Sequence, residues 1–274
     1  MMFIDSPMLR ALYSLPILFI VFLSWTIVFF FYKGYIFLVQ CTLLNSIVYI
    51  SFHTSLFLMY WSYYKAITTD PGTIPPNFKI TSSSSSLEEN DRIKEEQYCG
   101  KCEMERPSRC HHCHICNRCI LKMDYHCPFI GNCVGFFNIR YVCQFMVYAS
   151  ICSIFVGSCC GHLFVVNEGE ASIFTMCGML SGLGLSAALP ALAAFDCWLI
   201  VNNRSVMELQ ENTFDNKYDL GDGKKNIWQV CGKSILGYIL PINTKYEGDG
   251  INYEISVNYC QEELKETEKA SEEI

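Results

Sequence analysis

The sequence has little charge: Asp, Glu, Lys and Arg make up 17% of its 274 residues. Four long stretches carry almost none of it, and their polar residues are mostly Ser, Thr, Asn and Gln. The stretches are residues 12–32, 36–64, 142–166 and 171–201. Each holds the ~20 apolar residues that a helix needs to cross a bilayer. A soluble protein of this length does not need four such runs. The sequence therefore predicts a polytopic membrane protein, with His53 and Asp196 as exceptions inside the runs.

Basic residues are scarce in two of the segments that connect these runs. Lys33 is the only one between the first two runs, and none lies between the last two. Residues 65–140 carry ten, and the part that follows from Asn202 carries eight. Because Lys and Arg favour the cytoplasmic side of a membrane, both termini and the central segment are predicted to be cytosolic. No signal peptide is apparent, since the first run is long enough to span and lacks a convincing cleavage site.

The net negative charge of the chain does not indicate nucleic acid as a partner. The net charge is −7 at pH 7, and much of it comes from glutamates between Glu262 and Glu273. Such a run is typical of a solvated tail, so residues 246–274 are predicted to be disordered.

Cysteine, in contrast, is abundant, with 17 in the chain. Eight of them fall between Cys99 and Cys133, on the side assigned to the reducing cytosol, where metal binding is expected rather than disulfides. The apolar runs hold others, such as Cys143 and Cys152, which we interpret as small packing residues.

One spacing of cysteine and histidine occurs twice in this segment, shifted by 14 residues. The first set is Cys99, Cys102, His112 and Cys119, and the second is Cys113, Cys116, His126 and Cys133. Soft thiolate and imidazole ligands in fours predict two tetrahedral, structural zinc sites. A third copy would begin at Cys127, but Ile130 occupies the position three residues on. Cys127 therefore remains a spare thiol beside a zinc-ligating histidine, and Pro128 restricts its backbone.

Three further residues of the segment fall outside both sets. Cys110 is interpreted as a structural residue, and His111 and His114 as surface residues or as donors around the metal sites. The segment has little apolar content, so we expect it to fold into short hairpins and turns only when metal is bound.

These motifs together resemble those of the DHHC family of protein S-acyltransferases (palmitoyltransferases). Besides the two ligand sets, the matching motifs are Arg106-Pro107-x-Arg109, Asp124-Tyr125-His126-Cys127-Pro128, Cys133-Val134-Gly135 with Asn138, Asp70-Pro71-Gly72, Asn203-Arg204-Ser205-Val206-Met207-Glu208 and Asn226–Gly232 with Pro241. The similarity covers most of residues 10–245.

The resemblance implies an all-α membrane fold of four transmembrane helices, with a cytosolic zinc-bound cysteine-rich domain of short hairpins between helices 2 and 3. The expected parts are 1–66 with helices 1 and 2, 67–97 with the DPG turn and a linker, 98–140 as the zinc-binding catalytic domain, 141–201 with helices 3 and 4, 202–245 as a cytosolic C-terminal domain, and 246–274 as the acidic tail. The Golgi or the endoplasmic reticulum is the expected location.

The chemistry that the resemblance implies is transfer of a long-chain acyl group, usually palmitoyl, from acyl-CoA to a cysteine of a membrane-associated protein. Cys127 is the expected nucleophile and carries the acyl group as a thioester. Asp124 is the expected orienting group, hydrogen-bonded to Tyr125 or to a neighbouring backbone group. Arg106 and Arg109 are candidates for binding the phosphates of CoA. The acyl chain is expected in a cavity among the helices, where small residues such as Cys152 and Gly157 leave room.

Tyr125 departs from the family pattern, which has a histidine that takes the proton from the cysteine. A phenol with a reference pKa near 10 is a poor base at neutral pH. Each Cys3His zinc site also carries a formal charge of about −1, which disfavours a further thiolate. Formation of the Cys127 thiolate is therefore expected to depend on nearby cations such as Arg118 or Lys122, on peptide N–H groups, or on a replacement base such as His111 or His114.

Two alternatives remain beside the acyltransferase. The first is a family member that has lost efficient catalysis and acts as a membrane-bound interaction protein, as Tyr125 suggests. The second is a membrane ubiquitin ligase with a cross-braced zinc module. Such modules usually end on a second close Cys-x2-Cys pair, whereas this segment ends on Cys127-x5-Cys133.

Overall fold

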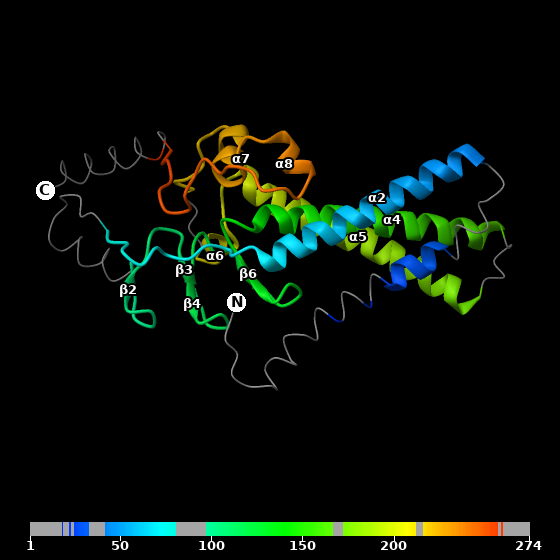
Figure 1. The fold of residues 1–274 in the computed structure, drawn as a ribbon, viewed down its shortest axis with the longest axis horizontal. Coiled ribbons are helices and arrows are strands. Elements are labelled where there is room, and N and C mark those ends of the chain that lie inside the picture. The colour runs from blue at the N-terminus through cyan, green and yellow to red at the C-terminus, as the bar shows by residue number, and fades with distance from the viewer. Residues whose placement is uncertain are drawn as a thin grey trace, which may run out of the picture.

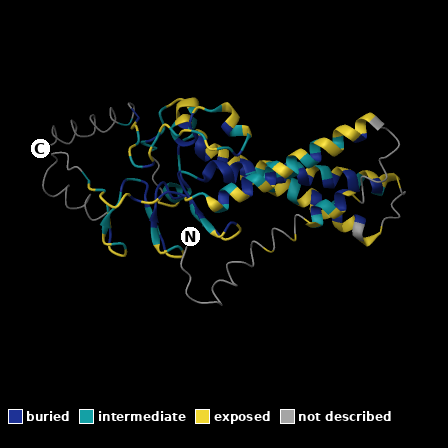
Figure 2. Ribbon diagram, in the orientation of Figure 1, coloured by how far each residue is buried: buried dark blue, intermediate teal, exposed yellow. Residues whose placement is uncertain are grey.

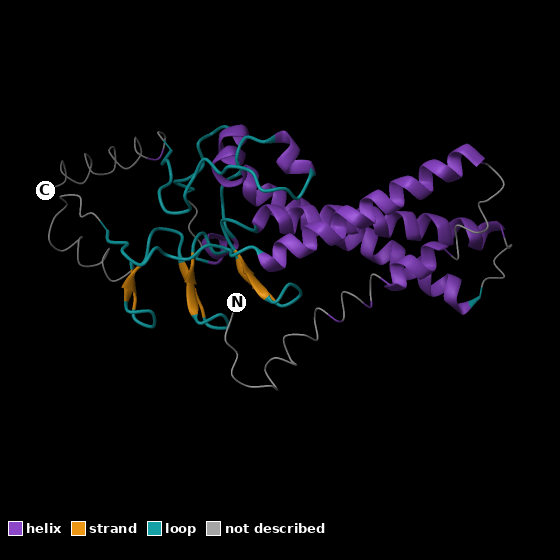
Figure 3. Cartoon of the chain, viewed as in Figure 1, coloured by secondary structure: helices purple, strands orange, loops and turns teal. Residues whose placement is uncertain are grey.

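Long helices make up one end of the molecule, and small hairpins with short helices make up the other (Figure 1, Figure 3). The computed structural model describes residues 18, 22, 25–32, 42–80, 97–166, 172–211, 216–256 and 259. Most of the predicted serine-rich linker and most of the predicted acidic tail lie outside these residues. The prediction of disorder is wrong for residues 246–256, because Tyr246 and Tyr253 pack against Phe136.

Three long helices cross the molecule: α2 (Thr42–Thr68), α4 (Ile139–Val166) and α5 (Ile173–Val201). Among the described residues, these three are long and apolar enough to span a membrane. The first predicted run is described only in part, with residues 25–32 helical. Three spans are therefore present by length and composition, and the fourth stays a prediction.

The central helix of this bundle is α4, which packs against both α2 and α5. One core cluster joins it to α2 and to the helical residues 25–32, where the ring of Phe31 stacks on that of Phe52 with centroids 3.7 Å apart. Many large apolar side chains on α2 and α5 point outward instead, as the exposed residues along the helices show (Figure 2). An outward apolar surface is unfavourable in water and suits helices that face lipid.

The helices α4 and α5 approach closely at a pair of glycines. A Cβ on Gly182 would lie 2.6 Å from the backbone nitrogen of Gly157. Small residues allow such close approach of membrane helices. The space that Gly157 was expected to leave for an acyl chain is therefore filled by α5, and Cys152 is buried in the core.

The cysteine-rich segment forms three antiparallel two-stranded hairpins in a row (Figure 1). The first hairpin is β1 (Tyr98–Cys99) with β2 (Met104–Glu105), the second is β3 (His111–Cys113) with β4 (Arg118–Ile120), and the third is β5 (Tyr125–Cys127) with β6 (Asn132–Val134). The second and third hairpins are offset by 14 residues, which is the spacing of the repeated ligand sets. The short hairpins predicted for this cysteine-rich segment are confirmed.

The turns of the three hairpins repeat in the same way. Glu103, Asn117 and Gly131 lie 14 residues apart, and their φ angles are 53°, 49° and 58°. Each turn thus needs one residue in the left-handed region, which costs least for glycine and asparagine. The third hairpin has the turn of a metal-binding hairpin although it lacks the second cysteine.

Three short helices follow α5: α6 (Val206–Gln210), α7 (Gly223–Cys231) and α8 (Ile235–Ile239). Side chains of Ser205, Asp222 and Ser234 cap their N-termini. At α6 the cap is reciprocal, because Glu208 also accepts a hydrogen bond from the backbone N–H of Ser205. In Figure 1, α6 lies beside the hairpins, whereas α7 and α8 lie together at the ends of the long helices, where α7 contacts α5 and α8 contacts α4.

Candidate functional site

The two predicted ligand sets form two compact clusters. Within each cluster the four ligand atoms all lie within 4.8 Å of one another. The Nδ1 atom of His112 lies 3.2, 3.6 and 3.9 Å from its three sulfurs, and that of His126 lies 3.4, 3.6 and 3.7 Å from its own. A tetrahedral zinc ion with Zn–N and Zn–S bonds of ~2.0–2.3 Å requires separations of ~3.6 Å. Both clusters therefore fit a structural zinc ion with four protein ligands.

Each cluster joins two neighbouring hairpins. The Cys-x2-Cys pair comes from the turn of one hairpin, and the histidine and last cysteine are cross-strand partners on the next. His112 faces Cys119 in the second hairpin, and His126 faces Cys133 in the third. The metals thus fix the third hairpin, which carries Cys127, to the rest of the module.

Cys127 belongs to neither metal cluster and lies against the ends of the long helices. It ends β5, and only 9% of the residue is exposed. The core cluster around it includes residues of α2, α4, α5 and α7, namely Tyr63, Ala66, Ile139, Tyr141, Val142, Cys143, Ile200, Val230 and Cys231. The zinc hairpins therefore place an uncoordinated thiol where three candidate membrane helices converge.

The surroundings of Cys127 favour the neutral thiol. Burial raises the pKa of Cys127, and the negative charge of Asp196 raises it further, while the peptide N–H groups of Ile130 and Phe129 oppose both effects. From the sequence, cations, peptide N–H groups or a replacement base are expected to help to form the thiolate. Of these, the peptide N–H groups of Ile130 and Phe129 are present at the sulfur. A thiol in this setting needs a proton acceptor in order to act as a nucleophile.

Tyr125 is half-buried on β5 and packs against the core cluster of Cys127. Burial raises the pKa of its phenol, and the charge of Asp196 adds to that effect. The hydroxyl therefore stays protonated at neutral pH. Tyr125 can donate a hydrogen bond, but it is unsuited to accept a proton.

Asp124 links the third hairpin to the segment after α5. Only 1% of it is exposed, and its Oδ1 accepts a hydrogen bond from the backbone N–H of Val206 at 3.0 Å. Its Oδ2 lies 3.8 Å from Nζ of the fully buried Lys122. Burial raises the pKa of Asp124, whereas Lys122 and the Val206 amide lower it. Of the two partners expected for Asp124, the structure gives it a backbone amide.

Arg109 has a different role from the one predicted. Its guanidinium is buried, with Nε 2.6 Å from Glu208 Oε1 and Nη1 2.7 Å from Asn203 Oδ1. The rings of Tyr218 and Tyr253 lie at its faces. A guanidinium paired and enclosed in this way is not placed to meet the phosphates of CoA, so that prediction is corrected. Arg106 remains the candidate from the original pair.

The other expected helpers make contacts of their own. Arg118 pairs with Asp70 at 2.7 Å, and Lys122 donates to the carbonyl of Arg204 at 3.3 Å. His111 lies 3.8 Å from a carboxylate oxygen of Glu211, and His114 lies 2.8 Å from Nζ of Lys101. None of these contacts orients a base toward Cys127.

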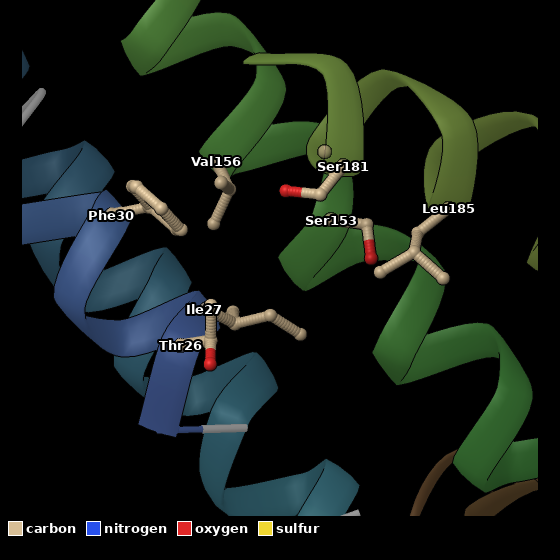
Figure 4. A pocket seen from close by; sticks show the side chains of 8 residues that line it. Thr26, Ile27, Phe30, Ser153, Val156, Ser181 and Leu185 are labelled. Carbon is tan, nitrogen blue, oxygen red and sulfur yellow. The ribbon is translucent and has the colours of Figure 1, made fainter. Parts of the chain in front are cut away.

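A small pocket lies farther along the helices. Thr26, Ile27 and Phe30 line it on one side, and Ser153 and Val156 of α4 with Ser181, Gly182 and Leu185 of α5 line the other (Figure 4). The three hydroxyl groups donate to backbone carbonyls of their own helices. The hydroxyl donors of the lining are therefore already used in hydrogen bonds, and the pocket can take an apolar group.

Comparison with known proteins agrees with these features. Residues 92–213 match the family model described as DHHC palmitoyltransferase. The chain is 31% identical over 285 residues to palmitoyltransferase ZDHHC2 of Danio rerio, covering 89% of this chain and 77% of that protein. It is 29% identical over 237 residues to palmitoyltransferase ZDHHC15 of Xenopus laevis, covering 74% and 70% of the two chains. It is also 30% identical over 220 residues to probable protein S-acyltransferase 14 of Arabidopsis thaliana, covering 70% of each chain.

Proposed function

The chain belongs to the DHHC palmitoyltransferase family, and we propose from this that it is a protein-cysteine S-acyltransferase that carries a long-chain acyl group on Cys127. One observation carries the assignment of the nucleophile. Cys110 and Cys127 are the two cysteines of the segment that belong to neither zinc cluster, and of these Cys127 lies in the core where the zinc hairpins meet α2, α4 and α5, whereas Cys110 packs in a separate cluster with Cys99 and Phe136. Palmitoyl-CoA is the proposed donor, and membrane-associated proteins with accessible cysteines are the proposed acceptors.

The proposed reaction has two half-reactions. In the first, the Cys127 sulfur attacks the thioester carbonyl of acyl-CoA, the new C–S bond forms, and CoA leaves as its thiol after gaining the proton. In the second, the sulfur of a substrate cysteine attacks the thioester on Cys127 and releases the enzyme thiol. Asp124 positions the third hairpin through Val206. Zinc takes no part in either step, because each cluster has four protein ligands and no open position.

The acyl chain is proposed to extend among the helices toward the pocket of Figure 4. Phe145 of α4 packs against both the core cluster of Cys127 and the cluster next to that pocket, so the two regions are continuous. An apolar chain placed along this path stays out of water while its thioester reaches the sulfur. The CoA part would lie on the side of the hairpins, where Arg106 is the proposed partner of its phosphates.

The membrane arrangement extends the same proposal. A fourth span over residues 12–32 would place residues 98–140 and 202–245 on the same side as both termini. The distribution of Lys and Arg supports the cytosol as that side. The Golgi and the endoplasmic reticulum are the proposed locations. We also propose the division of the chain at residues 66, 97, 140 and 201, with residues 246–256 joined to the preceding part because Tyr246 and Tyr253 pack against Phe136.

The alternative of an interaction protein without efficient catalysis is not favoured. The site keeps the uncoordinated thiol, both metal clusters and the buried carboxyl of Asp124. Loss of one base still leaves a cysteine capable of acylation, because general-base help is typically worth ~10²–10⁴-fold rather than the whole rate.

Acylation of the purified full-length protein tests the proposal. After incubation with palmitoyl-CoA, we expect a hydroxylamine-labile palmitoyl adduct on Cys127 by peptide mass spectrometry, and no adduct in Cys127→Ser. Cys177→Ser, which removes an exposed thiol of α5, should label like the wild type. Equal labelling of Cys127→Ser and wild type would refute the assignment, and a preference for short acyl chains would count against the proposed path.

A further inference from the structure

The turn that follows Cys127 repeats the backbone of a metal-binding turn. Cys127 and Ile130 lie 14 residues after Cys113 and Cys116, which belong to the second zinc cluster. The left-handed residue of each turn lies at the same place, with φ angles of 49° and 58°. The third hairpin therefore has an uncoordinated thiol at the position of a first metal ligand.

In the metal-binding turns, peptide N–H groups point at the sulfur of the first cysteine. The N–H of Cys116 donates to Sγ of Cys113 at 3.3 Å. In the first hairpin, the N–H groups two and three residues after the first cysteine donate to its sulfur. Such donors stabilise the negative charge of a metal-bound thiolate. At Cys127 the same two positions supply the donors, which are the N–H groups of Phe129 and Ile130.

The peptide group between Phe129 and Ile130 is held from its other side by α2. The hydroxyl of Tyr63 donates to the carbonyl oxygen of Phe129 at 2.8 Å. This peptide bond is trans and planar, so its carbonyl and its N–H point in opposite directions. Tyr63 therefore fixes one end of a rigid unit. The other end is the Ile130 N–H, which also donates to the carbonyl oxygen of Cys127 at 3.3 Å.

Tyr63 is itself held in place. It is only 8% exposed, it is a member of the core cluster around the site, and its ring packs against Phe145 with centroids 5.1 Å apart. The end of α2 is bonded to the same hairpin, because the side chain of Asn132 donates to the carbonyl oxygens of Ile67 and Thr69 at 3.3 and 3.2 Å. A donor supported in this way needs little reorganisation when charge develops beside it.

We propose that Tyr63 is a positioning residue for acyl transfer, and that the Ile130 N–H which it holds stabilises negative charge on the Cys127 sulfur. In the second half-reaction the C–S bond of the thioester breaks with its electron pair on Cys127, while the acceptor sulfur bonds to the carbonyl carbon. The proton of the acceptor thiol ends on the Cys127 sulfur. Because the thioester sulfur is neutral and the departing sulfur is charged, the hydrogen bond is stronger in the transition state than before it. This inference rests on the proposed function and names the groups that support its reacting sulfur.

The test measures the transfer step on the full-length protein. Cys127 is first acylated with palmitoyl-CoA, the excess is removed, and loss of the adduct to N-acetylcysteine is followed as a single turnover. Tyr63→Phe, which removes only the hydroxyl, is expected to slow this step about tenfold. Tyr64→Phe makes the same change on a side chain of α2 that is 63% exposed, and it should keep the wild-type rate.

A backbone substitution separates positioning from general support of the core. Replacing the Ile130 N–H by an ester oxygen removes the donor itself and is expected to slow transfer by ~10²-fold. In that background Tyr63→Phe has no N–H left to position, so its further cost should stay below about twofold. If Tyr63 only packed the core, its loss would slow transfer by the same factor in both backgrounds, and that result overturns the inference.

The outcomes distinguish this inference from the proposed function. If the wild type forms no adduct on Cys127, the proposed function fails. If the wild type forms the adduct and Tyr63→Phe transfers it at the wild-type rate, the inference is refuted and the proposed function stands. Retention of two zinc ions per chain shows that each variant has folded. If Tyr63→Phe does not retain zinc, the ester variant decides, and transfer from it at the wild-type rate refutes the role of the Ile130 N–H.

Discussion

Val206 shows how a site can lose a side-chain contact and keep its geometry. The family motif that residues 203–208 resemble has threonines at the positions of Ser205 and Val206, so one hydroxyl is missing at Val206. The backbone N–H of Val206 nevertheless donates to Asp124. A main-chain donor is present whatever the side chain, so the link between the third hairpin and the segment after α5 survives the substitution. Ser205 retains a hydroxyl and uses it to cap α6.

Glu208 supports the same link through charge. Burial alone would raise its pKa, but the charge and hydrogen bonds of Arg109 hold the pKa below its ordinary value. Glu208→Gln leaves the buried guanidinium without a counter-charge, which we expect to destabilise the fold by ~3–5 kcal/mol. The measurement is thermal unfolding of the zinc-loaded protein in detergent.

Glu211→Gln is the matched control for that variant. Its side chain is 54% exposed, and the change is expected to stay within ~0.5 kcal/mol. Equal unfolding temperatures for the two variants would show that the Arg109–Glu208 pair does not hold the hairpins to α6.

At the level of elements, the hairpins could be predicted because the ligands dictate them. A Cys-x2-Cys pair must bring two sulfurs to one ion, so the chain has to turn between them, and the 14-residue repeat sets where each hairpin recurs. The reciprocal cap of α6 by Ser205 and Glu208 was not predicted from the sequence. The role of Arg109 could not be predicted, because its partners Asn203 and Glu208 lie more than ninety residues away in the sequence.

Gly135 lies where the third hairpin meets the Asp70-Pro71-Gly72 turn. A Cβ at this position would lie 2.9 Å from the carbonyl oxygens of both Leu121 and Pro71. Because both are backbone atoms, the clash cannot be relieved by a rotamer change. Gly135→Ala is expected to cost ~1–3 kcal/mol, to weaken zinc retention and to slow acylation. Zinc release in mild denaturant measures the effect.

Gly100 provides the control within the same module, because a Cβ there meets nothing within 4 Å. Gly100→Ala should retain zinc like the wild type. If Gly135→Ala retained zinc equally well, the turn after α2 would not be part of the support of the third hairpin.

At the scale of the whole molecule, the site is assembled from segments that no local pattern connects. The apolar runs could be recognised in the sequence because a bilayer sets the length of a spanning helix. The ligand sets could be recognised because their spacing repeats after 14 residues. The convergence of α2, α4, α5 and α7 on Cys127 depends on tertiary packing, which the sequence does not display. Tyr63 is one of several aromatic residues in its run, and only the fold shows that its hydroxyl meets the turn after Cys127.

Zinc is expected to hold this assembly together, since the module has little core of its own and metal binding supplies its folding free energy. Removal of zinc with a chelator should therefore abolish acylation of Cys127 and expose its thiol to a bulky maleimide that does not reach it in the zinc-loaded protein. The helical signal in far-ultraviolet circular dichroism should largely remain, because α2, α4 and α5 do not depend on metal. Added Zn²⁺ should restore acylation, and Mg²⁺, which prefers oxygen ligands, should not. Full acylation after both ions have been removed would mean that the hairpins hold Cys127 in place without metal.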